Sequence, residues 1–311
     1  MDRVFAWAQG ATDVQDCVCH DCPSDGPAGA YRIKIVPTLS DNYSYLVVNA
    51  STQEAVVVDA ADGMVVRTVA ARLGVTLVAV LTTHYHADHC GGNADLAAQT
   101  PSLEIIAGAG DADRTPCVTR RVGDGEAFVC AGLAFTAVET PGHTRGSVCF
   151  LLDARDGQAP AVFTGDTLFI GGCGRFFEAP PETMRDSLAN AKLARLDPAT
   201  RVFPGHEYTA GNMKFCCALE PDSADARQAC EETAAQREKE LPTASTMARE
   251  LRLNPFMRSD DAAVQRAAGC EGDAVKTLAT IRRRKDTFTT VGKVITLFLD
   301  TKAALGGGSG P

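Results

Sequence analysis

The chain has 311 residues, of which 45% are hydrophobic, and it carries a formal net charge of -9. This length exceeds one typical domain, so we expect two unequal domains with enough apolar material for a buried core. The acidic balance argues against nucleic acid as a partner. No apolar run approaches the roughly 20 residues that a membrane helix needs, so we expect no membrane partner.

The first thirty residues predict a disordered leader. They are rich in Asp, Pro and Gly, carry five aspartates against one arginine, and contain no apolar signal core. We therefore expect the cytoplasm, with a mitochondrion or plastid left open. The cluster Cys17, Cys19, His20 and Cys22 offers four soft ligands, but six residues leave little chain to wrap a tetrahedral metal. The other cysteines are scattered, which argues against a disulfide framework.

From Tyr31 to about Tyr208, short apolar runs alternate with Gly and Asp turns, a pattern typical of strands. Helical spacing occurs at Met64–Leu73 and Pro181–Leu196. Many strands of antiparallel type with few helices predict two packed sheets flanked by helices. The predicted strands are Tyr43–Val48, Ala55–Val58, Val78–Leu81, Glu104–Ala107, Ala134–Val138, Ser147–Leu152 and Ala161–Phe163.

The pattern changes at about Asn212, where Ala, Glu, Arg and Gln take over with helical spacing, as in Ala224–Glu240 and Asp260–Ala268. We interpret this part as a smaller helical domain. Val291–Leu305 predicts a further helical extension, and Gly306–Pro311 a flexible tail. The predicted organisation is a leader over 1–30, a catalytic domain over 31–210, a helical domain over 211–290 and an extension over 291–311.

The segment Thr83–His89 contains three of the six histidines and reads T-H-Y-H-A-D-H. His84 and His86 lie two apart, so on an extended segment they point to the same side. A turn after them can direct Asp88 and His89 towards a second point. Neutral imidazole is the commonest metal ligand in proteins. This loop therefore predicts ligands for two cations.

Three further residues can complete the two ligand sets. His143 and His206 lie in Pro-Gly-His turns, and Asp166 follows the buried run Ala161–Phe163, where Gly165 lets the backbone turn. We expect one histidine for each cation and Asp166 between them. Nitrogen and carboxylate ligands suit zinc, iron or manganese. The predicted ligands are His84, His86, Asp88, His89, His143, Asp166 and His206.

Two cations at such a site predict hydrolysis, because coordination lowers the pKa of water from about 15.7 to near 7. We expect a hydroxide between the metals to be the nucleophile, with Asp88 and Asp166 as the catalytic carboxylates. A thioester is a suitable substrate, because its thiolate leaves without a strong general acid. Asp59, at the end of a strand, can orient a ligand imidazole, although a simple turn aspartate explains it equally well. We expect Tyr85 to pack beside the site.

The order of T-H-x-H-x-D-H, P-G-H-T, T-G-D-T and P-G-H-E-Y resembles the metallo-β-lactamase superfamily. Within it, the chain is similar to the hydroxyacylglutathione hydrolases, also called glyoxalase II, over about Ile33 to Phe288. The resemblance implies an α+β fold: an αββα sandwich with a smaller C-terminal helical domain. The resemblance includes Val36–Leu39 with Asp41–Tyr43, and Phe169–Phe177. The segments specific to the thioester hydrolases are Gly205–Thr209, Asn254–Arg258 and Arg282–Phe288.

This resemblance implies hydrolysis of glutathione thioesters, such as S-lactoylglutathione to lactate and glutathione in methylglyoxal detoxification, by a monomer that holds two ions, with zinc or iron as the usual metal. It implies that Arg282 and Lys285 hold the glycine carboxylate of glutathione, and that Arg175 and Tyr208 contact the substrate. From the residues alone, Arg282 and Lys285 would be a solvated helix face. Relatives commonly carry a tyrosine where Phe177 stands, and the lost hydrogen bond is worth roughly 0.5–1.5 kcal/mol.

Three alternatives stay open. The first is a persulfide dioxygenase-like oxidoreductase with one iron, which resembles this chain around His84–His89 but lacks the last histidine turn and the helical domain. The second is a hydrolase for thioesters of another thiol carrier. The third is a metal-binding scaffold without activity, which the filled ligand positions disfavour. Pro204–Tyr208 and Arg282–Lys285 argue against the first alternative.

Overall fold

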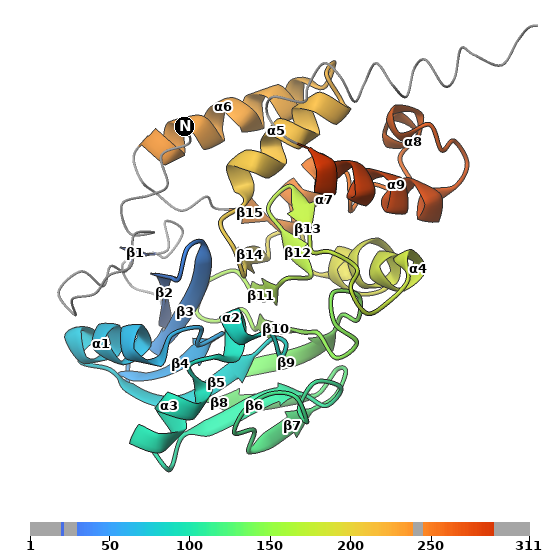
Figure 1. The fold of residues 1–311 in the computed structure, drawn as a ribbon. Coiled ribbons are helices and arrows are strands. Elements are labelled where there is room, and N and C mark those ends of the chain that lie inside the picture. The colour runs from blue at the N-terminus through green and yellow to red at the C-terminus, as the bar shows by residue number, and fades with distance from the viewer. Residues whose placement is uncertain (1–19, 22–29, 239–244, 289–311) are drawn as a thin grey trace, which may run out of the picture.

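The computed structural model describes residues 20–21, 30–238 and 245–288, in which two β-sheets pack face to face (Figure 1). The first sheet has seven strands in the order of the chain. They are β1 (His20–Asp21), β2 (Tyr31–Thr38), β3 (Asn42–Asn49), β4 (Glu54–Val58), β5 (Thr76–Thr82), β6 (Glu104–Gly108) and β7 (Arg120–Val122).

The second sheet has six strands in the order β15-β14-β11-β10-β9-β8, and a separate hairpin pairs β12 with β13. All seven strands predicted from sequence are present, with bounds within two residues of those expected. The strands are β8 (Ala127–Cys130), β9 (Leu133–Glu139), β10 (Val148–Leu152), β11 (Ala161–Gly165), β12 (Leu168–Phe169), β13 (Gly172–Cys173), β14 (Arg201–Pro204) and β15 (Ser245–Thr246).

The expectation of antiparallel strands is wrong for half of the first sheet, where β4 to β7 pair in parallel, and β11 also pairs in parallel with β14. Parallel neighbours need a crossover connection. Helix α1 (Gly63–Leu73), which matches its prediction, connects β4 to β5, and the short helices α2 (Ala87–Cys90) and α3 (Asn93–Gln99) lie between β5 and β6.

Side chains alternate between the two faces of each strand. Each sheet therefore packs one face against the other sheet and one face against helices, which gives four layers. In β3, Tyr45 and Val47 lie between the two sheets, while Leu46 and Val48 pack on the outer face in the same apolar cluster as Val66 of α1. The second sheet repeats the pattern and buries its outer face against α4 (Pro181–Arg185) and the C-terminal helices. The predicted αββα sandwich is therefore confirmed.

The helix predicted over Pro181–Leu196 is interrupted. After α4 the chain forms a π-helical turn at Asp186–Asn190 and a 3-10 turn at Leu193–Arg195. Leu188 and Leu193 are both fully buried under the second sheet. The apolar spacing therefore marked the buried face correctly, although the backbone is not one continuous helix.

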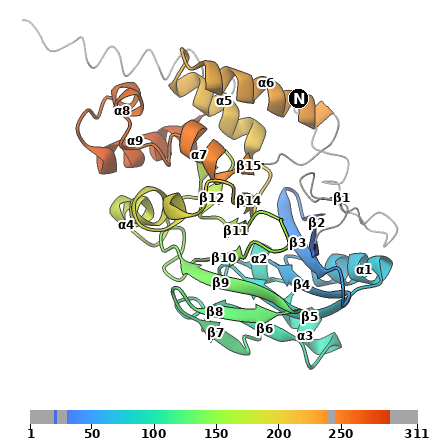
Figure 2. The same cartoon turned by 180° about the vertical axis from the view of Figure 1, so that it is seen from behind.

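Five helices form the C-terminal part of the described chain, and Figures 1 and 2 show them gathered on one side of the sandwich. Asp261 and Asp273 cap two of them by accepting hydrogen bonds from backbone amides. Among the described residues, no helix has the length and apolar character that would span a bilayer. The helices are α5 (Thr209–Leu219), α6 (Ala224–Glu238), α7 (Met247–Leu253), α8 (Ala262–Ala268) and α9 (Ala274–Thr287).

Most of the predicted leader lies outside the described residues, and so does the predicted extension over 291–311. Within the leader, His20 and Asp21 form β1, which pairs with Ile35 and Lys34 of β2. The other members of the proposed cysteine cluster also lie outside the described residues.

The packed space between the sheets gives a stability test. Phe150 is fully buried in it, so Phe150→Ala is expected to lower the free energy of unfolding by about 3–5 kcal/mol. Val129 is 67% exposed, and Val129→Ala is expected to change the free energy of unfolding by less than about 0.5 kcal/mol. Urea unfolding of both variants measures the difference. Equal effects would show that Phe150 does not pack as described.

Candidate metal centre

The predicted ligands lie where strands end at one edge of the sandwich. The loop after β5 carries the T-H-Y-H-A-D-H segment, which leads into α2, and Asp166 directly follows β11. His143 and His206 follow β9 and β14 in the same way. The structure thus brings together all seven ligands predicted from sequence. Their role as ligands stays a prediction.

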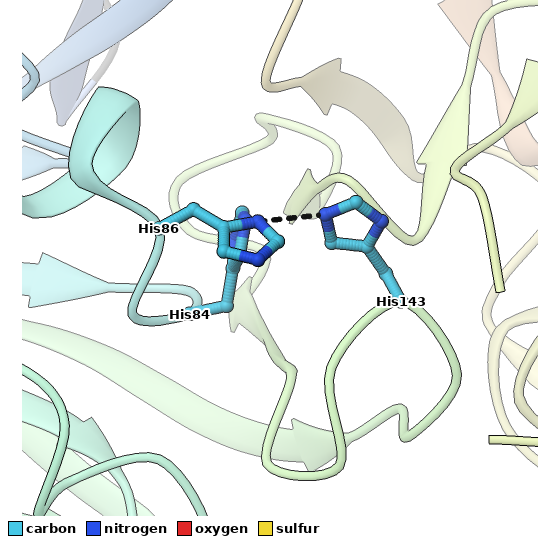
Figure 3. A group of neighbouring side chains, drawn as sticks. All are labelled: His84, His86 and His143. Atoms are coloured by element: carbon cyan, nitrogen blue, oxygen red, sulfur yellow. Dashed lines mark hydrogen bonds between the residues drawn. The ribbon is translucent and has the colours of Figure 1, made fainter. Parts of the chain in front are cut away.

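Six of the seven predicted ligands form two groups of three, and Asp166 forms a third group with His84 and His89. In the first, His86 Nδ1 lies 3.1 Å from His84 Nε2 and 3.0 Å from His143 Nε2 (Figure 3). In the second, His206 Nε2 lies 3.3 Å from His89 Nε2 and 3.4 Å from Asp88 Oδ2. These groups match the pairing expected from the order of the residues in the loop.

Asp166 lies between the two groups. Its Oδ1 is 3.2 Å from His89 Nε2 and 3.4 Å from His206 Nε2, and its Oδ2 is 3.4 Å from His143 Nε2. The Oδ1 atom is buried and has no hydrogen-bond partner. A buried carboxylate oxygen without a donor needs a cation or a proton nearby. Asp166 therefore lies where the predicted shared ligand would lie.

The spacing of the donors fits metal coordination. Two ligands about 2.1 Å from a zinc-like ion lie about 3.0–3.4 Å apart for angles between 90° and tetrahedral. The donor distances given above fall in this range, and His89 Nε2 lies 3.6 Å from Asp88 Oδ2. Imidazole with carboxylate suits zinc, iron or manganese. The residues therefore fit two divalent cations, and the cluster is the donor set of a dinuclear metal site.

In four of the imidazoles, the outer ring nitrogen, which faces away from the cluster, contacts a protein group that fixes the orientation of the ring. His86 differs, because its Nδ1 faces the cluster and its other nitrogen has no partner among the described residues. The pairs are His84 Nδ1 with Thr83 Oγ1 at 3.0 Å, His89 Nδ1 with Asp59 Oδ2 at 2.9 Å, His143 Nδ1 with the Arg175 carbonyl at 3.0 Å and His206 Nδ1 with Asp41 Oδ1 at 2.8 Å.

Asp59 contacts a predicted ligand imidazole, as expected from sequence. Besides facing His89, it accepts hydrogen bonds at 2.8 Å from both the amide and the hydroxyl of Thr83. Its φ of 54° is uncommon for a residue other than glycine. The contacts to His89 and Thr83 hold this backbone in place.

Sequence reasoning missed Asp41 and Asn42, which lie at the turn between β2 and β3. Asp41 orients His206, and the Asn42 side-chain amide donates to the Asp88 backbone at 3.0 Å and to its carboxylate at 3.1 Å. The short segment Asp41-Asn42-Tyr43 was the only sequence signal. It did not reveal which ligands these residues contact.

Without a cation, protons hold the second group together. Burial lowers the pKa of His89 and His206, but nearby carboxylates, above all Asp166, outweigh it and raise the values to about 10 and about 12. Burial would raise the pKa of Asp166, but the two imidazoles hold it well below its usual range. In the first group, burial and the neighbouring imidazoles lower the pKa of His84. His84 therefore keeps its lone pair free.

A cavity of about 680 Å³ opens above the donors and is lined by all five residues predicted to bind substrate, namely Arg175, Phe177, Tyr208, Arg282 and Lys285. The Tyr208 ring stacks on His206 with centroids 4.8 Å apart, and Phe177, 58% exposed, lies 5.1 Å from the His143 ring. The two exposed aromatic rings flank the metal site. Their role as substrate contacts stays a prediction.

The three basic residues of the cavity differ in their partners. Arg282 donates to the Cys173 carbonyl at 2.5 Å and to Asp286 at 3.2 Å, and Arg175 also pairs with Asp286 at 3.0 Å. Lys285 has no carboxylate partner in the described part of the chain, and burial lowers its pKa. Lys285 is therefore the cation best placed to meet an anionic ligand.

Tyr85 confirms its predicted place beside the site. Its hydroxyl donates to Glu178 at 2.9 Å and its ring lies under the Arg114 guanidinium, 3.8 Å from it. Two buried cysteines also lie nearby, and burial raises the pKa of Cys90 to about 12 and of Cys173 to about 11. These thiols stay protonated at neutral pH, which disfavours a cysteine nucleophile.

Metal affinity is expected to rise with pH. His89 and His206 are protonated near neutral pH, and a cation must displace these protons because it binds the lone pair. The apparent affinity for zinc should increase by up to about tenfold per pH unit for each displaced proton. Chelator competition between about pH 6.5 and 8.5 measures this. A zinc affinity that does not change over this range would contradict the protonation of His89 and His206.

Asp166→Ala is expected to lose bound metal, because it removes the carboxylate that lies between both groups of donors. Elemental analysis of the purified variant gives the metal content per chain. Asp113→Ala serves as the control, because this carboxylate is 81% exposed and lies on the surface. Full metal content in Asp166→Ala would refute the bridging role.

Each of the two parts of the chain matches a known protein family. Residues 37–206 match the model of the metallo-beta-lactamase superfamily, and residues 207–288 match that of the hydroxyacylglutathione hydrolase C-terminus. ETHE1 from Myxococcus xanthus shares the fold, with a TM-score of 0.56 and 22% identity over 92% of this chain and 99% of that one.

Two relatives named hydroxyacylglutathione hydrolase match over most of the chain. The cytoplasmic protein of Arabidopsis thaliana is 39% identical over 257 residues, which are 82% of this chain and 98% of the relative. A protein of a Synechococcus strain is 40% identical over 260 residues, 83% of this chain and 100% of the relative. The chain therefore belongs to the metallo-β-lactamase superfamily and, within it, to the hydroxyacylglutathione hydrolase family.

Proposed function

We propose that the protein hydrolyses thioesters of glutathione with hydroxy acids, such as S-lactoylglutathione, to the hydroxy acid and glutathione, as a step of methylglyoxal detoxification. One observation carries this proposal: five of the seven donors line the same cavity as Arg282 and Lys285 of α9. Both relatives described above are named for this activity. The thioester would reach the donors while its anionic thiol carrier lies against the helical domain.

The seven donors would hold two divalent cations, for which we propose zinc, with iron or manganese as the alternatives. Such a pair supplies an activated water and polarises the carbonyl that is attacked. The protein's part is to fix the donors. Asn42 holds the Asp88 carboxylate, and Asp166 keeps one buried oxygen free of protein donors. The thiolate of glutathione can leave unprotonated, so the site needs no strong acid.

We assign the binding of the thiol carrier to the wall opposite the metal site. Lys285 and Arg282 would face a carboxylate of glutathione, and Lys285 can do so without breaking an ion pair. Tyr208 and Arg175 would contact the rest of the carrier. Phe177 offers an apolar surface and no hydrogen-bond donor beside His143, so we expect its contacts to be made by packing alone.

We further propose that the protein acts as a monomer in the cytoplasm, and that its domains span 31–210 and 211–290. The match of the two family models to adjoining segments supports this division. The mononuclear dioxygenase alternative is disfavoured, because His206 joins the cluster and the helical domain is present.

The direct test is steady-state hydrolysis of S-lactoylglutathione beside lactoyl thioesters of other thiols, with elemental analysis of the same sample. We expect two ions per chain and the highest kcat/KM for the glutathione thioester. Hydrolysis only of other thioesters would reassign the thiol carrier. A single iron, with oxygen uptake on a glutathione persulfide, would replace the hydrolase by the oxidoreductase.

Lys285→Ala tests the proposed anchor. The loss of a charged contact worth about 1.5–3 kcal/mol should raise KM by about 10–100-fold and leave kcat little changed, because such binding is uniform along the reaction. Arg283→Ala is the matched control, since it removes the same charge from the exposed face of α9. Steady-state kinetics with S-lactoylglutathione measures both. A fall in kcat alone would contradict the assignment.

Arg282→Ala is expected to raise KM as well. It should in addition lower thermal stability, because Arg282 also donates to the Cys173 carbonyl. A melting temperature equal to that of Lys285→Ala would argue against this second contact.

A further inference from the structure

Side chains of the helical domain hold the hairpin of β12 and β13 by its backbone. Figure 1 shows this hairpin beside α7, and it leads directly to the cavity. Its five successive carbonyls, from Phe169 to Cys173, each accept a hydrogen bond from this domain. The donors are Asn254 Nδ2 to Phe169 and Gly172 at 3.2 and 2.9 Å, Asn212 Nδ2 to Ile170 at 3.0 Å, Cys216 Sγ to Gly171 at 3.4 Å and Arg282 to Cys173 at 2.5 Å.

A buried carboxylate accepts a hydrogen bond from a backbone amide of the hairpin. Glu250 is fully buried and accepts a hydrogen bond from the Gly171 amide at 2.8 Å and from Asn254 at 3.0 Å, and another from Ser245. Asn254 is also fully buried. Buried polar groups of this kind are costly unless every one is paired, so the network fixes one position of the hairpin.

The segment that leaves the hairpin touches two of the metal ligands. The Arg175 carbonyl accepts the hydrogen bond from His143 Nδ1 at 3.0 Å. Gly174 packs so closely that a Cβ there would lie 1.9 Å from the Asp166 carbonyl oxygen and 3.0 Å from His143 Nδ1. A displacement of the hairpin would therefore move the acceptor that sets the His143 ring, and would press on the Asp166 backbone.

We propose that the helical domain positions the metal centre, with Asn254 as the positioning residue that holds residues 168–175 and so orients His143. Asn254 touches neither substrate nor metal ligand and acts through the hairpin. Asn212 supports it through the Ile170 carbonyl. This role concerns metal binding and is independent of which thioester the protein cleaves.

Asn254→Asp in the full-length chain tests this role. The variant keeps the shape and the oxygen that accepts the Phe256 amide at 3.0 Å. It replaces the donor of both carbonyl contacts and of the contact to Glu250. Cobalt(II) and zinc titrations with a competing chelator give the two metal affinities, and the cobalt absorption spectrum reports the ligand geometry. One of the two affinities is expected to fall about 10–100-fold, with a changed spectrum.

The control is Thr233→Val, which removes a buried hydrogen bond to the Ala229 carbonyl within α6, away from the hairpin. It should lower the melting temperature and leave both metal affinities and the cobalt spectrum unchanged. Unchanged metal affinities and spectrum in Asn254→Asp, within about twofold, would overturn the proposal. So would an equal loss of affinity in Thr233→Val, because the effect would then follow from general destabilisation.

A double-mutant cycle identifies the path. If Asn254 acts through His143, adding Asn254→Asp to His143→Ala should cause no further loss of metal affinity, and a full additive loss would overturn this path. Should Asn254→Asp not fold, Asn212→Ala decides the question. Losing its single contact to Ile170 should weaken one metal by about 2–10-fold, and no change would overturn the proposal.

Discussion

The structure depends on holding seven donor atoms together although their lone pairs and negative charges converge in one small space. The inner nitrogens of the five imidazoles point at one another, and Asp166 keeps a buried oxygen without a donor. Such a cluster is unfavourable in an apolar interior unless cations or protons enter it. Two cations satisfy it fully. In their absence, protons on His89 and His206 neutralise the carboxylates of one half.

The sandwich places the predicted ligands at strand ends, and residues from several segments of the chain fix their side chains. Residues far apart in the chain supply the acceptors for the outer nitrogens: Asp41 comes from the turn after β2, Asp59 from the end of β4 and the Arg175 carbonyl from the segment after β13. Each acceptor sets one ring, and the two core clusters on either side of the first sheet hold the strands that carry them. Rigid packing therefore keeps the donors in place before metal binds.

The sequence predicted which residues the structure brings together, because their residue types and spacing are rare in combination and strand periodicity places them at strand ends. It could not predict what holds them. Asp41 and His206 are separated by 165 positions, so no local spacing relates them. Glu250 lies in a charged helical segment, where a glutamate normally faces solvent, yet it is fully buried. The parallel pairing of β4 to β7 was also missed, because side-chain periodicity shows which face of a strand is buried and not which strand lies beside it.

The helical domain then has two physical tasks that share residues. Arg282 lines the cavity and also donates to the Cys173 carbonyl, at the end of the row of carbonyls that Asn254 and Asn212 hold. Taking this domain away would leave those buried carbonyls without protein donors, at a cost of about 1–3 kcal/mol for each group that stays unsatisfied. The hairpin could then be stable only by moving towards water, and the Arg175 carbonyl that orients His143 would move with it. The cavity wall and the metal site are therefore parts of one packed unit, although they belong to different domains.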